Sequence, residues 1–229
     1  MKLHIVKSGS SGNSYIVQDS AQNTLLIECG KNTFQETLKQ VNIEKLSGGI
    51  FSHHHNDHAG DREVWEKFGI KFLGPENFTH AEQINIGKSQ EWSIIPLAVE
   101  HDANIDTYAA FIKSNIDGKV FFFATDCFSY ARAISALPEP LSICLCEINH
   151  SAHLLDTCRY PRELKQRISH THCSLERATL AIARAKCTKF IAIHPSETTI
   201  NQAEALEFLH NEFPNRSFAF ATPGLTVDF

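Results

Sequence analysis

Ser52-His53-His54-His55-Asn56-Asp57-His58-Ala59-Gly60 dominates this sequence, because four histidines and one aspartate lie within six consecutive positions. The apolar segment 48–51 just before it predicts a buried strand. Segment 62–68 just after it predicts a helix, since its apolar residues recur at helical spacing. The histidines therefore lie on a loop that leaves the end of a strand, where open α/β sheets usually carry their functional sites.

The spacing of these side chains favours metal binding. On an extended segment side chains alternate, so His53 and His55 point the same way and His54 points the other. Asp57 and His58 follow at the turn into the helix, and they offer a carboxylate and a nitrogen to a second metal close by. Imidazole and carboxylate ligands suit zinc, manganese or iron. A tag remnant or a solvated loop is the alternative, but the run is internal and framed by a strand and a helix.

Length and composition indicate one domain over residues 1–229. At 42% hydrophobic and 21% charged residues, the chain is ordinary for a soluble globular protein. No apolar run approaches the roughly 20 residues of a membrane span, and the polar start 1–7 does not resemble a signal peptide. We therefore expect no membrane partner.

The cysteines and the net charge restrict compartment and partners. The seven cysteines are scattered without a CxxC pair, so the sequence suggests neither a disulfide framework nor a cysteine zinc site, and we expect a cytoplasmic protein. A formal charge of −5 gives no global attraction to nucleic acid, so such a substrate needs a local basic patch and metal ions. The oligomeric state is left open, a homodimer being one option.

Four further candidate residues follow apolar strands. His101 and His194 each come after a strand, and Asp126 and Glu147 end two fully apolar strands. A carboxylate in such a place is costly unless it is paired or bound to metal. These residues are therefore candidates for the same site, with a surface loop as the alternative for Glu147.

Two polar segments are candidate anion sites. The loop 8–14 is rich in serine and glycine and forms either a backbone nest for an anion or a plain hairpin turn. In the helix expected over 159–168, Arg159, Arg162 and Lys165 recur every three residues and form either a phosphate-binding face or a solvated one. His172 lies near the start of the next helix, a favoured place for anions.

The order of expected elements predicts an α/β protein with two mixed sheets packed together and helices outside. The expected strands are 3–7, 14–18, 24–28, 48–51, 71–73, 92–98, 107–114, 119–124, 141–146, 190–193, 217–220 and 225–227, and the expected helices are 34–41, 62–68, 159–168, 175–186 and 201–211.

The pattern His53-x-His55-x-Asp57-His58 resembles the signature of the metallo-β-lactamase superfamily. The resemblance implies a four-layer αββα sandwich whose metals lie at one edge, where strand ends meet. It also implies two divalent metal ions, zinc or manganese, with iron as a further option. The implied ligands are His53, His55 and His101 for one ion, Asp57, His58 and His194 for the other, and Asp126 shared between them.

Further motifs indicate a branch of the superfamily. Glu147, His172-x-Ser174 and His194-x-Ser196 resemble elements of the ribonuclease Z group, but the long arm that holds transfer RNA there has no counterpart. Segments 8–14 and 147–150, Tyr160-Pro161 and His172-x-Ser174 resemble the WalJ (YycJ) group of small bacterial nucleases over nearly the whole chain. The chain departs from that pattern at Glu28, Leu175 and Pro195, which spares the ligands.

The resemblance implies a binuclear phosphodiesterase acting on DNA or RNA, exonuclease-like, in which a metal-bridging hydroxide attacks phosphorus. Asp57 would ligate a metal and orient the hydroxide, and His172, oriented by Glu147, would be the general acid. The alternatives are a phosphodiesterase of small or cyclic nucleotides, a thioesterase of the glyoxalase II type, a flavodiiron-like redox protein and a binding module. The expected substrate-binding residues are Ser10, Asn13, Asn149, His150, Arg159, Arg162 and Ser174.

Overall fold

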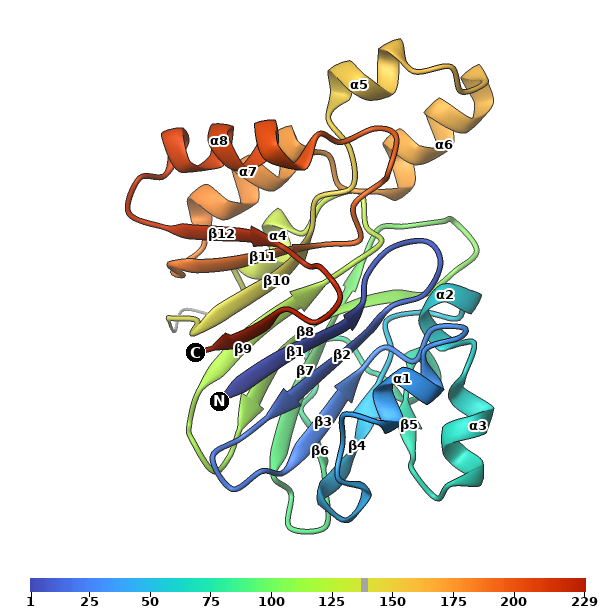
Figure 1. The fold of residues 1–229 in the computed structure, drawn as a ribbon, viewed down its shortest axis with the longest axis vertical. Coiled ribbons are helices and arrows are strands. Elements are labelled where there is room, and N and C mark those ends of the chain that lie inside the picture. Colours follow the sequence, from blue (N-terminus) through green and yellow to red (C-terminus); the bar gives the residue numbers. More distant parts are fainter. Residues whose placement is uncertain (137–139) are drawn as a thin grey trace. The chain divides into compact units, whose positions relative to one another are not determined.

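The computed structural model describes residues 1–136 and 140–229 and contains two mixed β-sheets with helices (Figure 1). One sheet has six strands in the order β13-β1-β2-β3-β4-β5, and the other has seven in the order β12-β11-β10-β9-β8-β7-β6. None of the helices in these two stretches is long and apolar enough to cross a membrane.

The strands are β1 (Lys2–Lys7), β2 (Ser14–Gln18), β3 (Thr24–Ile27), β4 (Leu46–Ile50), β5 (Phe72–Leu73), β6 (Ile84–Ile86), β7 (Trp92–Val99), β8 (Thr107–Ser114), β9 (Val120–Ala124), β10 (Ile143–Glu147), β11 (Lys189–Ile193), β12 (Ser217–Phe220) and β13 (Thr226–Asp228). The helices are α1 (Phe34–Leu38), α2 (Asn56–Ala59), α3 (Arg62–Lys67), α4 (Ala131–Ile134), α5 (Ala152–Thr157), α6 (Arg162–Thr171), α7 (Leu175–Arg184) and α8 (Gln202–Glu212), with short 3₁₀ turns at Ile43–Lys45 and Pro75–Asn77.

The described residues divide into two compact units. The first unit contains Met1–Leu97, Ala110–Val120 and Ala221–Phe229, and the second contains Ala98–Ala109 and the described part of Phe121–Phe220. That the whole chain acts as one domain stays a prediction.

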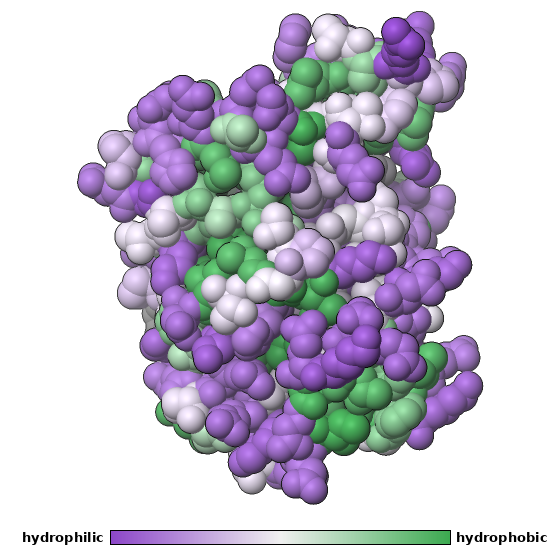
Figure 2. Space-filling model, in the orientation of Figure 1, coloured by the Kyte–Doolittle hydropathy of each residue, from purple (hydrophilic) through white to green (hydrophobic). Residues whose placement is uncertain are grey.

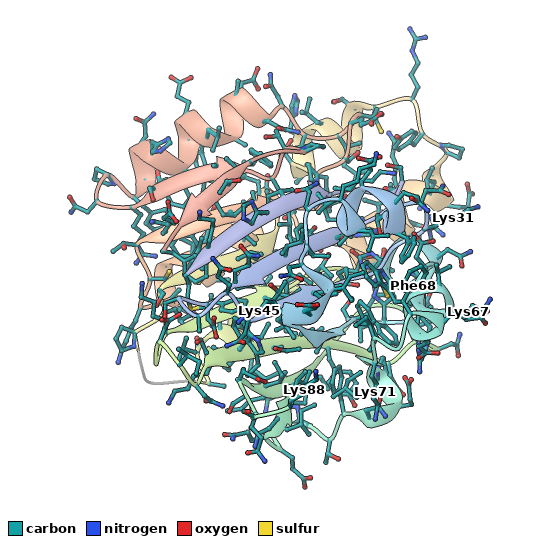
Figure 3. The ribbon with its side chains drawn as sticks, turned by 60° about the horizontal axis from the view of Figure 1, so that its bottom comes forward. Lys31, Lys45, Lys67, Phe68, Lys71 and Lys88 are labelled. Atoms are coloured by element: carbon teal, nitrogen blue, oxygen red, sulfur yellow. The ribbon has the colours of Figure 1, made fainter. Side chains whose placement is uncertain are left out.

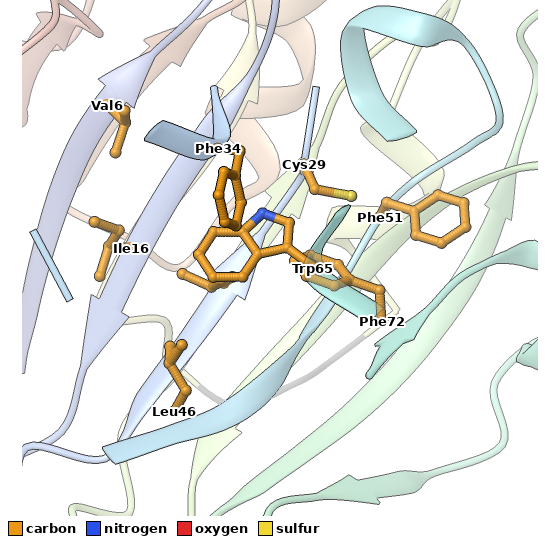
Figure 4. Packing of buried hydrophobic residues seen from close by; sticks show 9 residues of the cluster. Val6, Ile16, Cys29, Phe34, Leu46, Phe51, Trp65 and Phe72 are labelled. Atoms are coloured by element: carbon orange, nitrogen blue, oxygen red, sulfur yellow. The ribbon is translucent and has the colours of Figure 1, made fainter. Parts of the chain in front are cut away.

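Aromatic packing on the six-stranded sheet positions the histidine loop of the first unit (Figure 4). Trp65 of α3 is only 1% exposed, and its ring meets that of Phe34 of α1 edge-on, with centroids 4.7 Å apart. Because β4 and α3 flank the histidine stretch, this packing fixes both ends of the loop. The cluster consists of Val6, Ile16, Leu26, Cys29, Phe34, Leu46, Phe51, Trp65 and Phe72.

We expect Trp65→Ala to lower the free energy of unfolding by about 3–5 kcal/mol, because it removes buried aromatic surface and leaves a cavity. Urea unfolding followed by circular dichroism measures this change. Leu180→Ala is the control: Leu180 is 63% exposed, so its change should stay within about 0.5 kcal/mol. Equal effects of the two substitutions would contradict this account of the core.

In the second unit, parallel pairing brings strand ends to one edge. The pairs β9–β10, β10–β11 and β11–β12 are all parallel. Asp126 follows β9, Glu147 ends β10 and His194 follows β11. All three residues therefore lie at the same edge of the sheet. Helix α7 packs against α4 and α8 against β12. Many of the side chains over α8 in Figure 2 are hydrophilic, although Phe208 of this helix is 41% exposed.

The elements differ from the expected ones mainly at short segments. The helices α2, α4 and α5 and the three-residue strand β6 were not expected, because elements of one turn or a few residues carry little periodicity. Pro161 caps α6, which begins at Arg162, so Arg159 precedes the helix. The expectation that Arg159, Arg162 and Lys165 share one helical face was therefore wrong.

Candidate active site

The histidine loop of the first unit brings two imidazoles together. His53 Nε2 and His55 Nδ1 lie 2.8 Å apart, and His53 is completely buried, with Ser52 Oγ 2.9 Å from its Nδ1. His54 turns away, as the alternation predicts: its side chain is 56% exposed and lies 3.2 Å from the Glu76 carboxylate. Two converging ring nitrogens are the chemistry expected of a metal site.

Asp57 and His58 form the second part of this loop, on the short helix α2. Asp57 Oδ2 lies 3.2 Å from His58 Nε2, and Glu28 Oε2 lies 3.2 Å from His58 Nδ1. Burial raises the pKa of Glu28, although His58 and the Ser52 amide, which donates to Glu28, oppose the rise. Glu28 thus fixes the ring of His58 so that Nε2 faces Asp57. This role of Glu28 was not predicted from the sequence. The available signal was that Glu28 is an acid at the end of a buried strand.

Asn13 holds the histidine loop through hydrogen bonds to the backbone carbonyl of Asp57. Its N–H and its side-chain amide both donate to the Asp57 carbonyl, at 2.8 and 3.1 Å, and its Nδ2 lies 3.2 Å from His58 Nε2. Gly30 packs against the same point: a Cβ there would lie 2.0 Å from the Asp57 carbonyl oxygen, so no larger residue fits without a shift. Asn13 was expected to bind substrate, but the structure buries it completely.

In the second unit, four side chains at the sheet edge form a cluster. The potential ligand atoms of Asp126, Glu147, His172 and His194 all lie within 4.8 Å of one another. His194 Nδ1 is 3.5 Å from an oxygen of both Asp126 and Glu147, and the rings of His172 and His194 stack. Asp126 and His194 have φ angles of 46° and 52°, a left-handed conformation that costs side-chain-bearing residues energy and often marks functional sites.

The pair of Glu147 and His172 is the strongest interaction in this cluster. Glu147 Oε1 lies 2.7 Å from His172 Nδ1, and the other oxygen accepts the amides of Cys127 and Cys173 at 3.2 and 2.9 Å. Burial acts to raise the pKa of Glu147, but His172 and His194 together outweigh it and the pKa is lowered. Burial acts to lower the pKa of His172, but Glu147 and Asp126 outweigh it and the pKa is raised. Both shifts favour the carboxylate form of Glu147 and the imidazolium form of His172.

His101 is oriented by a backbone carbonyl. Its Nδ1 donates to the Thr171 carbonyl at 2.8 Å, because a carbonyl can only accept, and the other nitrogen lies 4.0 Å from Asp126 Oδ2. This leaves Nε2 with its lone pair, the form that binds metal. The Thr171 carbonyl had no sequence signal.

The other expected substrate residues lie in two settings. Asn149 is buried and its Nδ2 donates to the His194 carbonyl at 3.0 Å, which supports a positioning role for it. His150 and Ser174 are buried and pair in a parallel β-bridge, and Ser174 Oγ caps α7 by accepting the Arg177 amide. Ser10, Arg159 and Arg162 are exposed.

His150 makes the stability of the protein sensitive to acid. Burial lowers its pKa from 6.5 to about 4, so the folded state binds fewer protons than the unfolded state between these pH values. The free energy of unfolding should then fall as the pH drops through this window, by up to about 1.4 kcal/mol per pH unit. Urea unfolding at pH 6.5 and 5 should show a smaller loss for His150→Gln than for the wild type. An equal loss in both proteins would contradict the assignment.

The donor groups of both units suit divalent metal ions. In the loop of the first unit and in the cluster of the second, imidazole nitrogens lie close to carboxylate oxygens, a donor set that zinc, manganese and iron accept. The buried carboxylates of Asp126 and Glu147 are consistent with this, since buried charges require a counter-charge or a metal.

Known proteins resemble the chain over most or all of its length, although no protein-family model matches it. The exodeoxyribonuclease WalJ of Streptococcus pneumoniae (serotype 2, strain D39) is 27% identical over 253 residues, which cover 100% of this chain and 92% of that protein. The exodeoxyribonuclease YycJ of Bacillus anthracis is 26% identical over 208 residues, which cover 80% of this chain and 77% of that protein.

A solved structure confirms the expected fold class. The metallo-β-lactamase fold protein YhfI from Bacillus subtilis superposes with a TM-score of 0.76 at 17% identity and covers 99% of both chains. The two mixed sheets and flanking helices are thus those of an αββα sandwich. The chain is a metallo-β-lactamase-fold protein that resembles the WalJ (YycJ) branch of the superfamily.

Proposed function

We propose that this protein is a metal-dependent phosphodiesterase that hydrolyses nucleic acid, with DNA as the first candidate. The observation that carries the proposal is the distance of 2.7 Å between Oε1 of the buried Glu147 and Nδ1 of His172. Such a pair suits the protonation of a poor leaving group. The alkoxide that leaves a phosphodiester is a poor leaving group. Relatives that match the chain along most of its length bear the name exodeoxyribonuclease, which supports this substrate class.

The proposed ligands are those that the resemblance implies, and the donor chemistry within each unit supports them. Two divalent ions, zinc or manganese with iron as a further option, would supply Lewis acidity at the phosphoryl group and a water of lowered pKa. The ligands would be His53, His55 and His101 for one ion, Asp57, His58 and His194 for the other, and Asp126 for both.

The side chains have distinct proposed tasks in the reaction. Asp57, whose side chain is 22% exposed, orients the attacking water and accepts its hydrogen bond. The water loses one proton to solvent, a bond forms from its oxygen to phosphorus, and the bond from phosphorus to the leaving oxygen breaks. His172, 17% exposed, gives its proton to that leaving oxygen, while Glu147 stabilises the imidazolium before the transfer.

Local positive charge can offset the net charge of −5. In the first unit, five exposed lysines and the exposed ring of Phe68 project from the surface, as Figure 3 shows. Lysines attract phosphates, and an exposed aromatic ring can stack on a base. The labelled lysines are Lys31, Lys45, Lys67, Lys71 and Lys88. A cytoplasmic location and a homodimer stay predictions.

A substrate panel tests the proposed function. Metal-loaded protein is incubated in parallel with single- and double-stranded DNA, RNA, cyclic nucleotides and a glutathione thioester, and the products are resolved by length. Hydrolysis of nucleic acid above the other substrates is expected. Turnover of the thioester alone would overturn the proposal, and preferential turnover of cyclic nucleotides would correct the substrate.

A further inference from the structure

A small cavity in the second unit lies outside the cluster of Asp126, Glu147, His172 and His194. Its volume is about 240 Å³, below the roughly 300–1,000 Å³ of pockets for drug-sized ligands, so it suits a small group rather than a whole nucleotide. The start of α7, the helices α5 and α6 and the end of the β10 segment form its walls. The polar lining residues are His150, Asp156, Lys165, Gln166, Ser169, Ser174 and Arg177.

Two cations of the cavity are held by backbone carbonyls. Arg177 donates to the Ser169 carbonyl at 2.8 Å, and its guanidinium lies 3.7 Å from the ring centre of Phe128. The Lys165 ammonium donates to the Asp156 carbonyl. A guanidinium has five N–H donors and an ammonium three, so each group retains donors for a ligand while its position is fixed.

His150 supplies a third, unusual feature. Only 2% of this residue is exposed, and its Nδ1 has no hydrogen-bond partner among residues 1–136 and 140–229. A buried polar atom without a partner costs about 1–3 kcal/mol, so such atoms in folded proteins usually meet a water or a ligand. The backbone of His150 is held in place because its carbonyl accepts the Leu175 amide at 2.8 Å.

Charge selects the class of ligand. Lys165 and Arg177 outnumber the one acid of the lining, Asp156, so the cavity favours an anion. Two kinds of donor line it, an ammonium and a guanidinium, beside the buried ring of His150. Phosphate oxygens accept from both, and a guanidinium binds phosphate with particular geometric fit.

We propose that this cavity binds a phosphate group of the substrate other than the one that is hydrolysed. The source of the phosphate rests on the proposed function, whereas the anion site itself does not. His150 follows Glu147 by three residues and Ser174 follows His172 by two. The segments that carry the Glu147–His172 pair thus also form the cavity, and a phosphate held there would fix the strand relative to the general acid. The site would raise the affinity for the substrate and fix the register of the nucleic-acid strand, rather than raise the rate of bond cleavage.

Lys165→Gln tests the site, with Arg167→Gln as its matched control, because Arg167 lies on the same helix and is exposed but does not line the cavity. Metal-free full-length protein is titrated with inorganic phosphate, and the side-chain resonances of His150 are followed by NMR. The wild type and Arg167→Gln should show a saturable shift, and Lys165→Gln should bind about tenfold more weakly.

The same variants are then compared in hydrolysis of oligonucleotides with a 5′-phosphate, a 3′-phosphate or no terminal phosphate. Lys165→Gln should raise KM about tenfold and leave kcat within about twofold. An effect confined to one phosphorylated end assigns the site to that terminal phosphate, and an equal effect on all three assigns it to an internal one.

Two results would overturn the proposal: His150 resonances that do not respond to phosphate, or equal phosphate affinities of Lys165→Gln and Arg167→Gln. If the wild type binds phosphate in a Lys165-dependent way but hydrolyses no phosphodiester, the proposed function fails and the anion site stands. If the wild type hydrolyses DNA but its His150 resonances do not respond to phosphate, the anion site fails and the proposed function stands.

Discussion

Asp57→Asn should reduce the rate of phosphodiester hydrolysis by about 10³-fold or more while the fold is retained. The substitution keeps the shape of the side chain but removes its charge, so it weakens metal binding and no longer orients the attacking water. The fold should survive because the substitution keeps the Asp57 backbone carbonyl, which accepts from the Asn13 amide and side chain. Rates at saturating metal, metal content and urea unfolding measure the three consequences.

Asp61→Asn is the matched control, because it makes the same substitution four residues away. The Asp61 carboxylate accepts the amides of Thr33 and Phe34 at 2.7 and 2.8 Å, at the start of α1. We therefore expect it to lower the free energy of unfolding by about 1–2 kcal/mol and to leave the rate within about threefold. An Asp57→Asn protein with full metal content and more than about a tenth of the wild-type rate would contradict the role of Asp57.

His172→Ala should reduce the rate on DNA by about 10²–10⁴-fold, the usual contribution of a general acid. The loss should depend on the leaving group. A p-nitrophenyl phosphodiester releases a stabilised phenolate that needs no proton, so its hydrolysis should fall by less than about tenfold. Comparison of the two substrates separates the loss of an acid from damage to the site, which would reduce both rates alike.

His170→Ala is the control for His172→Ala. His170 lies on the same helix end and is exposed, and its Nδ1 lies 2.7 Å from the Gln166 carbonyl of its own helix. Its replacement should change either rate by less than about threefold. Equal losses on both substrates for His172→Ala would show that His172 is not the general acid.

Much of the site was predictable because it follows from local chain geometry. Alternation along an extended segment places His53 and His55 together and turns His54 away, and the structure shows this arrangement. Asp126 and Glu147 are noticeable in the sequence because apolar strands rarely end in acids without a reason. That they meet His194 at one edge requires parallel pairing of β9, β10 and β11, which the sequence does not specify.

The residues that orient the site were harder to predict, because their roles arise from contacts between distant segments. Glu28 meets His58 across 30 positions, and Asn13 meets Asp57 across 44. Neither contact leaves a periodic pattern, and Asn13 was therefore assigned to substrate. The Thr171 carbonyl that orients His101 is a backbone atom, so its residue type carries no signal.

The central claim is that metal ions held by these histidines and aspartates enable phosphodiester hydrolysis. The most direct test is one titration, in which chelator-treated protein is reloaded with zinc or manganese while bound metal per chain and the rate of DNA hydrolysis are measured together. We predict no turnover without metal and a rate that reaches its maximum as bound metal reaches two ions per chain. A chelated, metal-free protein that hydrolyses DNA at the full rate would contradict the account.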